Sequence, residues 1–235
     1  MSCGRTMRIL ICIFAAALVA CSRPAETPAP VTPAQSAPEA RAPAAPTEPT
    51  ALPPELIARL VRPHSPVLGR AKAPVTVVEV LDPACEACKA FAPVVEQLLF
   101  TYPEDVRVVV RYADFHPVSL QALRLLEAAR AQGKAHELIS ALFERQQEWA
   151  SHSAPNPARA WQIASDIGID VARARKDALA TSVDDMLNIE AKDLTALRVE
   201  RTPTFFVNGK PLPTFGAREL LDLVASEVQA AKSNK

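Results

Sequence analysis

The sequence predicts an α/β fold that carries an inserted α-helical subdomain. Two runs rich in β-branched residues, 73–81 and 106–112, are typical of buried strands, and the stretch between them has apolar and small side chains at helical spacing. A strand–helix–strand connection is right-handed, so we expect these two strands to be parallel. Helical patterns then fill the chain up to a third strand-like run, "TFFV", which indicates a helical insertion over about residues 117–197.

The first strand, "APVTVVEVL", leads into the helical pattern "EACKAFAPVVEQLLF". Cys88, Phe91, Val95 and Leu98 mark the apolar side of that pattern. Pro93 lies inside it. Because the apolar period continues beyond Pro93, we expect a kink there rather than the end of the helix.

The insertion divides into several helices, two of which end at Gly133 and Gly168, residues typical of helix ends. The predicted helices are 118–132, 134–148, 157–167, 171–179 and 183–197. We interpret their leucine-rich faces as subdomain core. A last helix, 217–231, is expected to cover the sheet.

The overall charge argues against one class of partner. Lys+Arg and Asp+Glu are balanced at 26 each, with a pI near 6.9, whereas a nucleic-acid binder would show a basic excess or stripe. We therefore expect no nucleic-acid partner. The 22 prolines, against 6 glycines, crowd toward the N-terminal part of the chain and show where the folded part begins.

Residues 1–20 have the pattern of a signal peptide, with Arg5 and Arg8 before the apolar run "ILICIFAAALVA". The run is too short to span a bilayer comfortably. It ends in "LVAC", which resembles the lipobox of bacterial lipoproteins and implies that Cys21 becomes the lipidated N-terminus. Ser22 at the next position implies sorting to the outer membrane by the same resemblance. An ordinary secretory signal peptide is the alternative.

Residues 21–52 consist mainly of Pro, Ala, Thr, Glu and Ser. Such a segment buries too little apolar surface to offset its ordering entropy, so we expect a disordered tether. Residues 53–66 form the lead-in to the folded domain at 67–235, and "PPELIARLVR" within them could be a short helix that pairs subunits.

After signal-peptide removal and lipidation of Cys21, the remaining cysteines are Cys85 and Cys88, in "DPACEACKAF". A structural zinc site needs four Cys or His ligands at short paired spacings, and the chain's 4 histidines show no such pairing. A purely structural disulfide is disfavoured because closing so short a loop removes little unfolded-state entropy. A redox pair in an oxidising compartment is the favoured interpretation.

Cys85 falls at the predicted strand-to-helix turn, where unpaired N–H groups and the positive end of the helix dipole favour a thiolate. Cysteines in such positions have pKa values of about 3.5 to 7.5. We expect Cys85 to be the exposed, attacking sulfur. Cys88, one turn inside the helix, should be shielded and should resolve the mixed disulfide.

These features together resemble the thioredoxin superfamily, in particular its DsbA-like thiol–disulfide oxidoreductases, over about residues 67–230. The stretch "TPTFFVNG" is similar to the cis-proline loop of that family, followed by a strand and a hairpin turn at Asn208-Gly209. The resemblance implies a thioredoxin-like fold in which Pro203 is cis and lies against the cysteine pair. It also implies that the backbone of Thr202 offers hydrogen bonds to a substrate strand.

Glu86 and Ala87, between the cysteines, are assigned with Thr202 to the substrate-binding part of the site. They replace the proline and histidine common in strongly oxidising members of the family. A charge beside the Cys85 thiolate repels it by about 1 kcal/mol at 4 Å in water, which should raise the pKa of Cys85 and weaken its oxidising power. The direction of electron flow therefore stays open.

Two further residues are candidates for the site. Glu79 stands six residues before Cys85, where the family has a buried acid; the resemblance implies a raised pKa and proton relay to Cys88. A strand-edge or ion-paired glutamate is the alternative. His116 follows the second strand and therefore falls on the same sheet edge as Cys85, although a loop or helix-cap histidine is the simpler interpretation.

The predicted function is a thiol–disulfide oxidoreductase, anchored by its lipid to the periplasmic face of the outer membrane. It exchanges disulfides with cysteine-containing client proteins and with a membrane or periplasmic thiol redox partner. The catalytic set is Cys85, Cys88, Glu79 and Pro203, with no metal or organic cofactor. One alternative is a copper-binding thioredoxin-fold protein that uses both thiolates and a histidine such as His116. Another is a redox-inert adaptor that binds peptides, which retention of both cysteines disfavours.

Overall fold

The computed structural model describes residues 49–233. The predicted signal peptide 1–20, the predicted lipidation site Cys21 and residues 22–48 of the predicted tether lie outside the described residues. Within the part described, no helix has both the length and the apolar character needed to cross a membrane.

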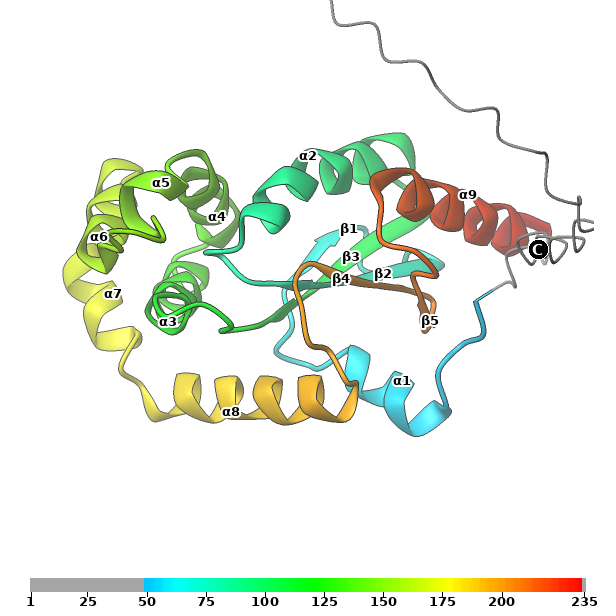
Figure 1. The fold of residues 1–235 in the computed structure, drawn as a ribbon, viewed down its shortest axis with the longest axis horizontal. Helices are drawn as coiled ribbons and strands as arrows, with labels where there is room; N and C mark the ends of the chain where they lie inside the picture. Colours follow the sequence, from blue (N-terminus) through cyan, green and yellow to red (C-terminus); the bar gives the residue numbers. More distant parts are fainter. Residues whose placement is uncertain (1–48, 234–235) are drawn as a thin grey trace, which may run out of the picture. The chain divides into compact units, whose positions relative to one another are not determined.

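A five-stranded mixed sheet forms the centre of the described domain (Figure 1). Its strands are β1 (Val67–Gly69), β2 (Val75–Leu81), β3 (Val106–Tyr112), β4 (Thr204–Val207) and β5 (Lys210–Pro211). The order is β1-β3-β2-β4-β5, and β2 pairs with β3 in parallel while the other pairs are antiparallel. The parallel pair is confirmed. The sequence does not predict β1, because its three residues are too few to show an alternation of apolar and polar side chains.

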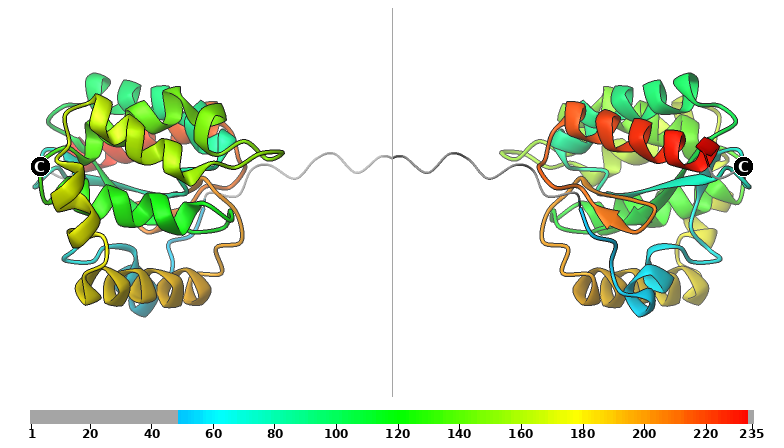
Figure 2. Two further views of the ribbon diagram at one scale, coloured as in Figure 1. Left: turned by 90° about the vertical axis from the view of Figure 1, so that its left-hand side faces the viewer. Right: turned by 90° about the vertical axis from the view of Figure 1, so that its right-hand side faces the viewer.

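Helices cover both faces of the sheet, as Figures 1 and 2 show. On one face lie α2 (Glu86–Thr101) and α9 (Ala217–Ser233), and on the other lie α1 (Pro54–Leu60) and α8 (Thr181–Ala196). α2 continues through Pro93 to Thr101, so the proline does not end the helix, as expected.

Side chains of strand β2 contribute to the hydrophobic cores on both faces of the sheet, because successive Cβ atoms of a strand point to opposite faces. Val77 packs with Phe91 of α2 and its neighbours, whereas Val78 and Val80 pack with Leu60 of α1 and Leu194 of α8. Alternation therefore fixes the face on which each β2 side chain lies. Glu79 shares its parity with Val77 and so lies on the face that α2 covers.

Most of the chain between β3 and β4 forms helices beside the sheet, and its last helix, α8, covers one face of the sheet (Figure 1). They are α3 (Ser119–Arg130), α4 (Ala135–Glu144), α5 (Gln146–Trp149), α6 (Pro157–Asp166), α7 (Val171–Asp177) and α8. The single helix predicted for 134–148 is wrong, because the chain leaves helical geometry at Arg145 (φ −102°, ψ 23°). The break lets the buried Trp149 donate its indole N–H to the Leu142 carbonyl at 2.9 Å.

The short helix predicted within 53–62 is confirmed as α1, and it packs on α8 of its own chain. Arg62 reaches Asp193 of α8 at 2.7 Å, and Arg59 reaches it at 3.0 Å. Arg111 of β3, fully buried, also binds Asp193 and pairs with Glu190 of α8 at 2.8 Å. Burial alone would raise the pKa of Asp193, but hydrogen bonds from the three arginines outweigh it and hold the pKa at about 2. This network joins the lead-in, the sheet and the insertion.

The β4–β5 connection is the tight turn expected from the sequence. Asn208 and Gly209 have positive φ angles of 48° and 80°, which the favoured two-residue hairpin turn requires. Asn208 also accepts the backbone N–H of Thr76 through its side chain at 2.9 Å, so the turn is fixed against β2.

Candidate active site

Cys85 is the N-cap residue of α2. Its own N–H donates to the carbonyl of Asp82 at 3.1 Å, which closes the turn between β2 and the helix. The Cys85 sulfur accepts the backbone N–H of Cys88 at 3.4 Å and lies 3.3 Å from the carbonyl oxygen of Thr202. The predicted position at the helix N-terminus is confirmed.

The surroundings of Cys85 favour its thiolate. A hydrogen bond from the Cys88 thiol is the largest cause, and contacts with Thr202 and with the backbone N–H groups of Cys88 and Ala87 add to it. Together they outweigh desolvation and lower the pKa of Cys85 to about 5. The prediction that Cys85 is exposed is wrong: the residue is buried, with only 6% of its surface accessible. Thr202 and the first turn of the helix cover most of the sulfur.

Cys88 lies deeper, with no accessible surface. Its hydrogen bond to Cys85 and its burial raise its pKa far above that of a free thiol, and the nearby charges of Cys85 and Glu79 add to the rise. Both cysteines are free thiols in the structure, which therefore shows the reduced form of the pair. The two sulfurs differ in both depth and acidity, in the direction the sequence predicts.

Glu79 is 3% exposed on the central strand β2, so the strand-edge interpretation is wrong. Burial raises its pKa from 4.5 to about 8. The carboxyl group lines a cavity of about 110 Å³ between the sheet and helices α2, α3 and α4. The cavity wall is largely apolar and includes Leu81, Val95, Val110, Leu126 and Phe143. The charge of this carboxyl group is also among the causes that raise the pKa of Cys88.

Pro203 follows a cis peptide bond, as the sequence resemblance implies. It is buried and directly precedes β4, which pairs with β2. The preceding residue, Thr202, is half-buried, and its carbonyl oxygen contacts the Cys85 sulfur. The loop and the cysteine pair are thus brought together from positions 117 residues apart.

Between the cysteines, Glu86 is exposed and Ala87 is half-buried. Gln147 donates its side-chain N–H to Glu86 at 3.0 Å, and the His152 Nε2 lies 3.8 Å from the same oxygen. Both partners come from α5 or from the loop that follows it. Side chains of the helical insertion therefore interact with the Glu86 carboxylate, a contact that the local sequence does not predict.

Asp82, not singled out by sequence reasoning, organises the other side of the site. Its fully buried carboxyl group accepts the Ala84 N–H at 2.8 Å, the Phe115 N–H at 2.8 Å and the His116 N–H at 3.2 Å. It also binds the Ser119 hydroxyl and the His116 Nδ1, the latter at 2.9 Å. The available signal was an acidic residue at the end of an apolar strand, three positions before Cys85.

The copper interpretation requires a histidine ligand in addition to the two thiolates. Among residues 49–233, no group of three or more His, Cys, Asp or Glu side chains is placed to hold a metal ion. His116, the histidine considered for copper, directs its Nδ1 to Asp82.

The fold and the site together define a thioredoxin-like protein with a helical insertion. A family model described as thioredoxin matches residues 62–220. A solved thioredoxin-like oxidoreductase from Silicibacter pomeroyi is 27% identical, with a TM-score of 0.63 over 74% of this chain and 96% of that chain. The chain therefore belongs to the thioredoxin family.

More distant structures share the fold. BdbD from Bacillus subtilis is 23% identical with a TM-score of 0.61, covering 70% of this chain and 93% of its own. The α-DsbA1 of Wolbachia pipientis is 17% identical with a TM-score of 0.66, covering 74% and 96%. The predicted thioredoxin-like fold is confirmed.

Curated relatives include a protein named Na(+)/H(+) antiporter NhaA 1 from Mycobacterium sp. strain KMS, 32% identical over 170 residues. The alignment covers 67% of this chain but 26% of that relative, so this chain spans about a quarter of the relative's length.

Proposed function

We propose that this protein exchanges disulfides with cysteine-containing client proteins through Cys85 and Cys88, without a metal or organic cofactor. The carrying observation is the contrast between the two sulfurs: Cys85 caps α2 with a pKa of about 5, whereas Cys88 is fully buried with a raised pKa. A thiolate is the nucleophile in disulfide exchange, so Cys85 reacts first.

The chemistry proceeds in two steps. The Cys85 thiolate attacks a client disulfide, a Cys85–client bond forms, and the second client sulfur leaves with the electron pair and takes up a proton. Cys88 then loses its proton, attacks the Cys85 sulfur and releases the first client sulfur as a thiolate. The protein ends oxidised and the client reduced, and the reverse sequence oxidises a client dithiol.

Exchange with glutathione tests this function. We expect the oxidised protein to equilibrate with reduced glutathione as one two-electron couple, because the pair forms one disulfide from two thiols. The equilibrium is measured by quenching with an alkylating agent and counting modified cysteines. It gives the reduction potential of the Cys85–Cys88 pair, and this potential shows whether oxidation or reduction of clients is favoured. Cys85→Ser, the matched control, should not exchange. A wild-type pair that stays unchanged across a wide range of glutathione ratios would refute the proposed activity.

We also propose that the protein acts at the periplasmic face of the outer membrane, held by a lipid on Cys21. The support is the sequence "LVACS" with the proline-rich stretch behind it. In that compartment a membrane or periplasmic thiol redox partner would reset the pair after each turnover.

Mass spectrometry of the protein isolated from its native envelope tests the anchor. The expected N-terminal peptide begins at Cys21 and carries diacylglycerol and an acyl group, because the lipobox places cleavage directly before the cysteine. A Cys21→Ser variant should lose the mass of the lipid and leave the membrane fraction. An unmodified N-terminus elsewhere in 15–25 would show an ordinary secretory signal peptide instead.

A further inference from the structure

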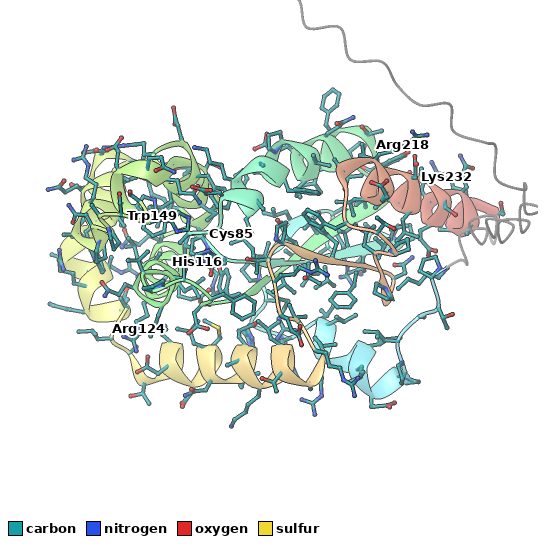
Figure 3. The ribbon with its side chains drawn as sticks, in the orientation of Figure 1. Cys85, His116, Arg124, Trp149, Arg218 and Lys232 are labelled. Atoms are coloured by element: carbon teal, nitrogen blue, oxygen red, sulfur yellow. The ribbon has the colours of Figure 1, made fainter. Side chains whose placement is uncertain are left out.

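The Asp82–His116 pair has no role in the exchange chemistry above, yet it lies beside the reacting cysteines. β2 and β3 are parallel neighbours in register at Leu81 and Tyr112. Cys85 and His116 each follow that register pair by four residues, on the same edge of the sheet. Figure 3 shows both in one part of the domain, between the sheet and the inserted helices.

Asp82 fixes how the His116 ring is presented. Its Oδ2 accepts the backbone N–H groups of Phe115 and His116 and lies 2.9 Å from the ring Nδ1. An oxygen approached by several donors acts as acceptor, so Nδ1 carries the hydrogen and the lone pair lies on Nε2. A carboxyl group that holds an imidazole in this way is the arrangement by which hydrolases orient a histidine base.

The free side of the ring faces outward. The His116 side chain is 30% exposed, while Asp82 behind it is fully buried. Among the described residues, the titratable groups that face the ring are Asp82 and His152, whose ring centroid lies 6.2 Å away. Beyond His152 lies Glu86, between the two cysteines. His152 thus links the neighbourhood of His116 to the residues between the two cysteines.

The exchange reaction needs a proton acceptor on this outer side. Glu79 is buried on the face of β2 that α2 covers, and its charge influences the pKa of Cys88. A client thiol has an ordinary pKa of about 8.5, so it is mostly protonated near neutral pH and reacts slowly until it loses its proton.

We propose that His116, oriented by Asp82, is a catalytic residue that accepts the proton of an incoming client thiol and returns it when a client sulfur leaves. When the oxidised protein reacts, the client sulfur bonds to the Cys85 sulfur as its proton passes to Nε2. The Cys85–Cys88 bond breaks, and its electron pair stays on the Cys88 sulfur, which takes a proton from Glu79. In the opposite direction the departing client sulfur takes the proton back from Nε2. Asp82 is the positioning residue. This assignment rests on the proposed exchange function.

The test compares His116→Asn with wild type in the full chain. Asparagine keeps an N–H that can donate to Asp82 but removes the Nε2 base. The oxidised proteins react with a cysteine-containing peptide between pH 6 and 9.5, and the second-order rate is followed by loss of free peptide thiol. We expect the variant to be about tenfold slower or more at pH 6 and equal to wild type above the thiol pKa, where no acceptor is needed. Added imidazole should restore part of the lost rate.

His64→Asn is the matched control: it makes the same change in a histidine that also pairs with a buried carboxylate, Glu190 at 2.7 Å, and it should follow wild type at every pH. A His116→Asn deficit of the same size at all pH values would reveal a structural role and overturn the proposal, as would a wild-type profile. The same pH-dependent deficit in His64→Asn would overturn it too. A wild-type protein that fails to react with the peptide at any pH would refute the exchange function itself, and the inference with it.

Discussion

A Cys88→Ser variant is expected to accumulate stable mixed disulfides with clients through Cys85, and a Cys85→Ser variant to accumulate none. The N-cap sulfur has a pKa of about 5 and is therefore largely a thiolate at neutral pH. Cys88 is needed only to release the client, so its loss blocks the second step and leaves the first intact. A serine hydroxyl can still donate to the Cys85 sulfur, which preserves the largest cause of its lowered pKa.

The mixed disulfides are measured on non-reducing gels after cells expressing each variant are quenched with acid and an alkylating agent. Bands that collapse on reduction should be abundant with Cys88→Ser and absent with Cys85→Ser and with the double variant. Trapping by Cys85→Ser but not by Cys88→Ser would reverse the two roles, and the argument from the helix N-terminus would be wrong.

The features that the sequence predicts well are those that local patterns encode. β-branched runs predict β2 and β3, and the handedness of the connection through α2 predicts their parallel pairing. The spacing of the cysteines after β2 predicts that Cys85 caps the helix. The cis peptide at Pro203 was available only from family resemblance, since X–Pro bonds are usually trans.

The features that local patterns miss depend on contacts between distant segments. The break at Arg145 in the predicted helix 134–148 accompanies side-chain bonds to Glu148 and Asp166. The covering of the Cys85 sulfur depends on Thr202, 117 residues away. The role of Asp82 depends on the β3–α3 loop, whose backbone N–H groups it accepts. The hydrophobic periodicity of the sequence carries no information about such long-range contacts. The sequence therefore predicts the position of the cysteine pair but not the residues that surround it.

Replacing Glu79 with glutamine is expected to stabilise the reduced protein at neutral and alkaline pH. The pKa of Glu79 is raised from 4.5 to about 8 by burial, so unfolding releases a proton from this group anywhere between those values. The wild type therefore loses stability as the pH rises from 4.5 to about 8, whereas the variant has no such loss. The difference should be small below pH 4.5 and grow to several kcal/mol near pH 8, since each pKa unit corresponds to about 1.4 kcal/mol. Urea unfolding at a series of pH values measures it, and a difference independent of pH would contradict the raised pKa.

The same substitution should slow the release of clients, because Cys88 has a raised pKa and must lose its proton before it can attack. We expect the Glu79 carboxylate, whose charge is among the causes that raise that pKa, to be the proton acceptor on the buried side of the site. In stopped-flow reactions of the reduced protein with a disulfide-containing peptide, formation of the mixed disulfide should change less than about twofold, while its resolution near pH 7 should slow about tenfold or more. Glu227→Gln is the matched control: it makes the same chemical change in a carboxylate of α9 that pairs with Lys210 at 2.7 Å, and it should leave both steps unchanged. An equal slowing of both steps by Glu79→Gln would instead show a general disturbance of the site, and unchanged resolution would remove Glu79 from the reaction.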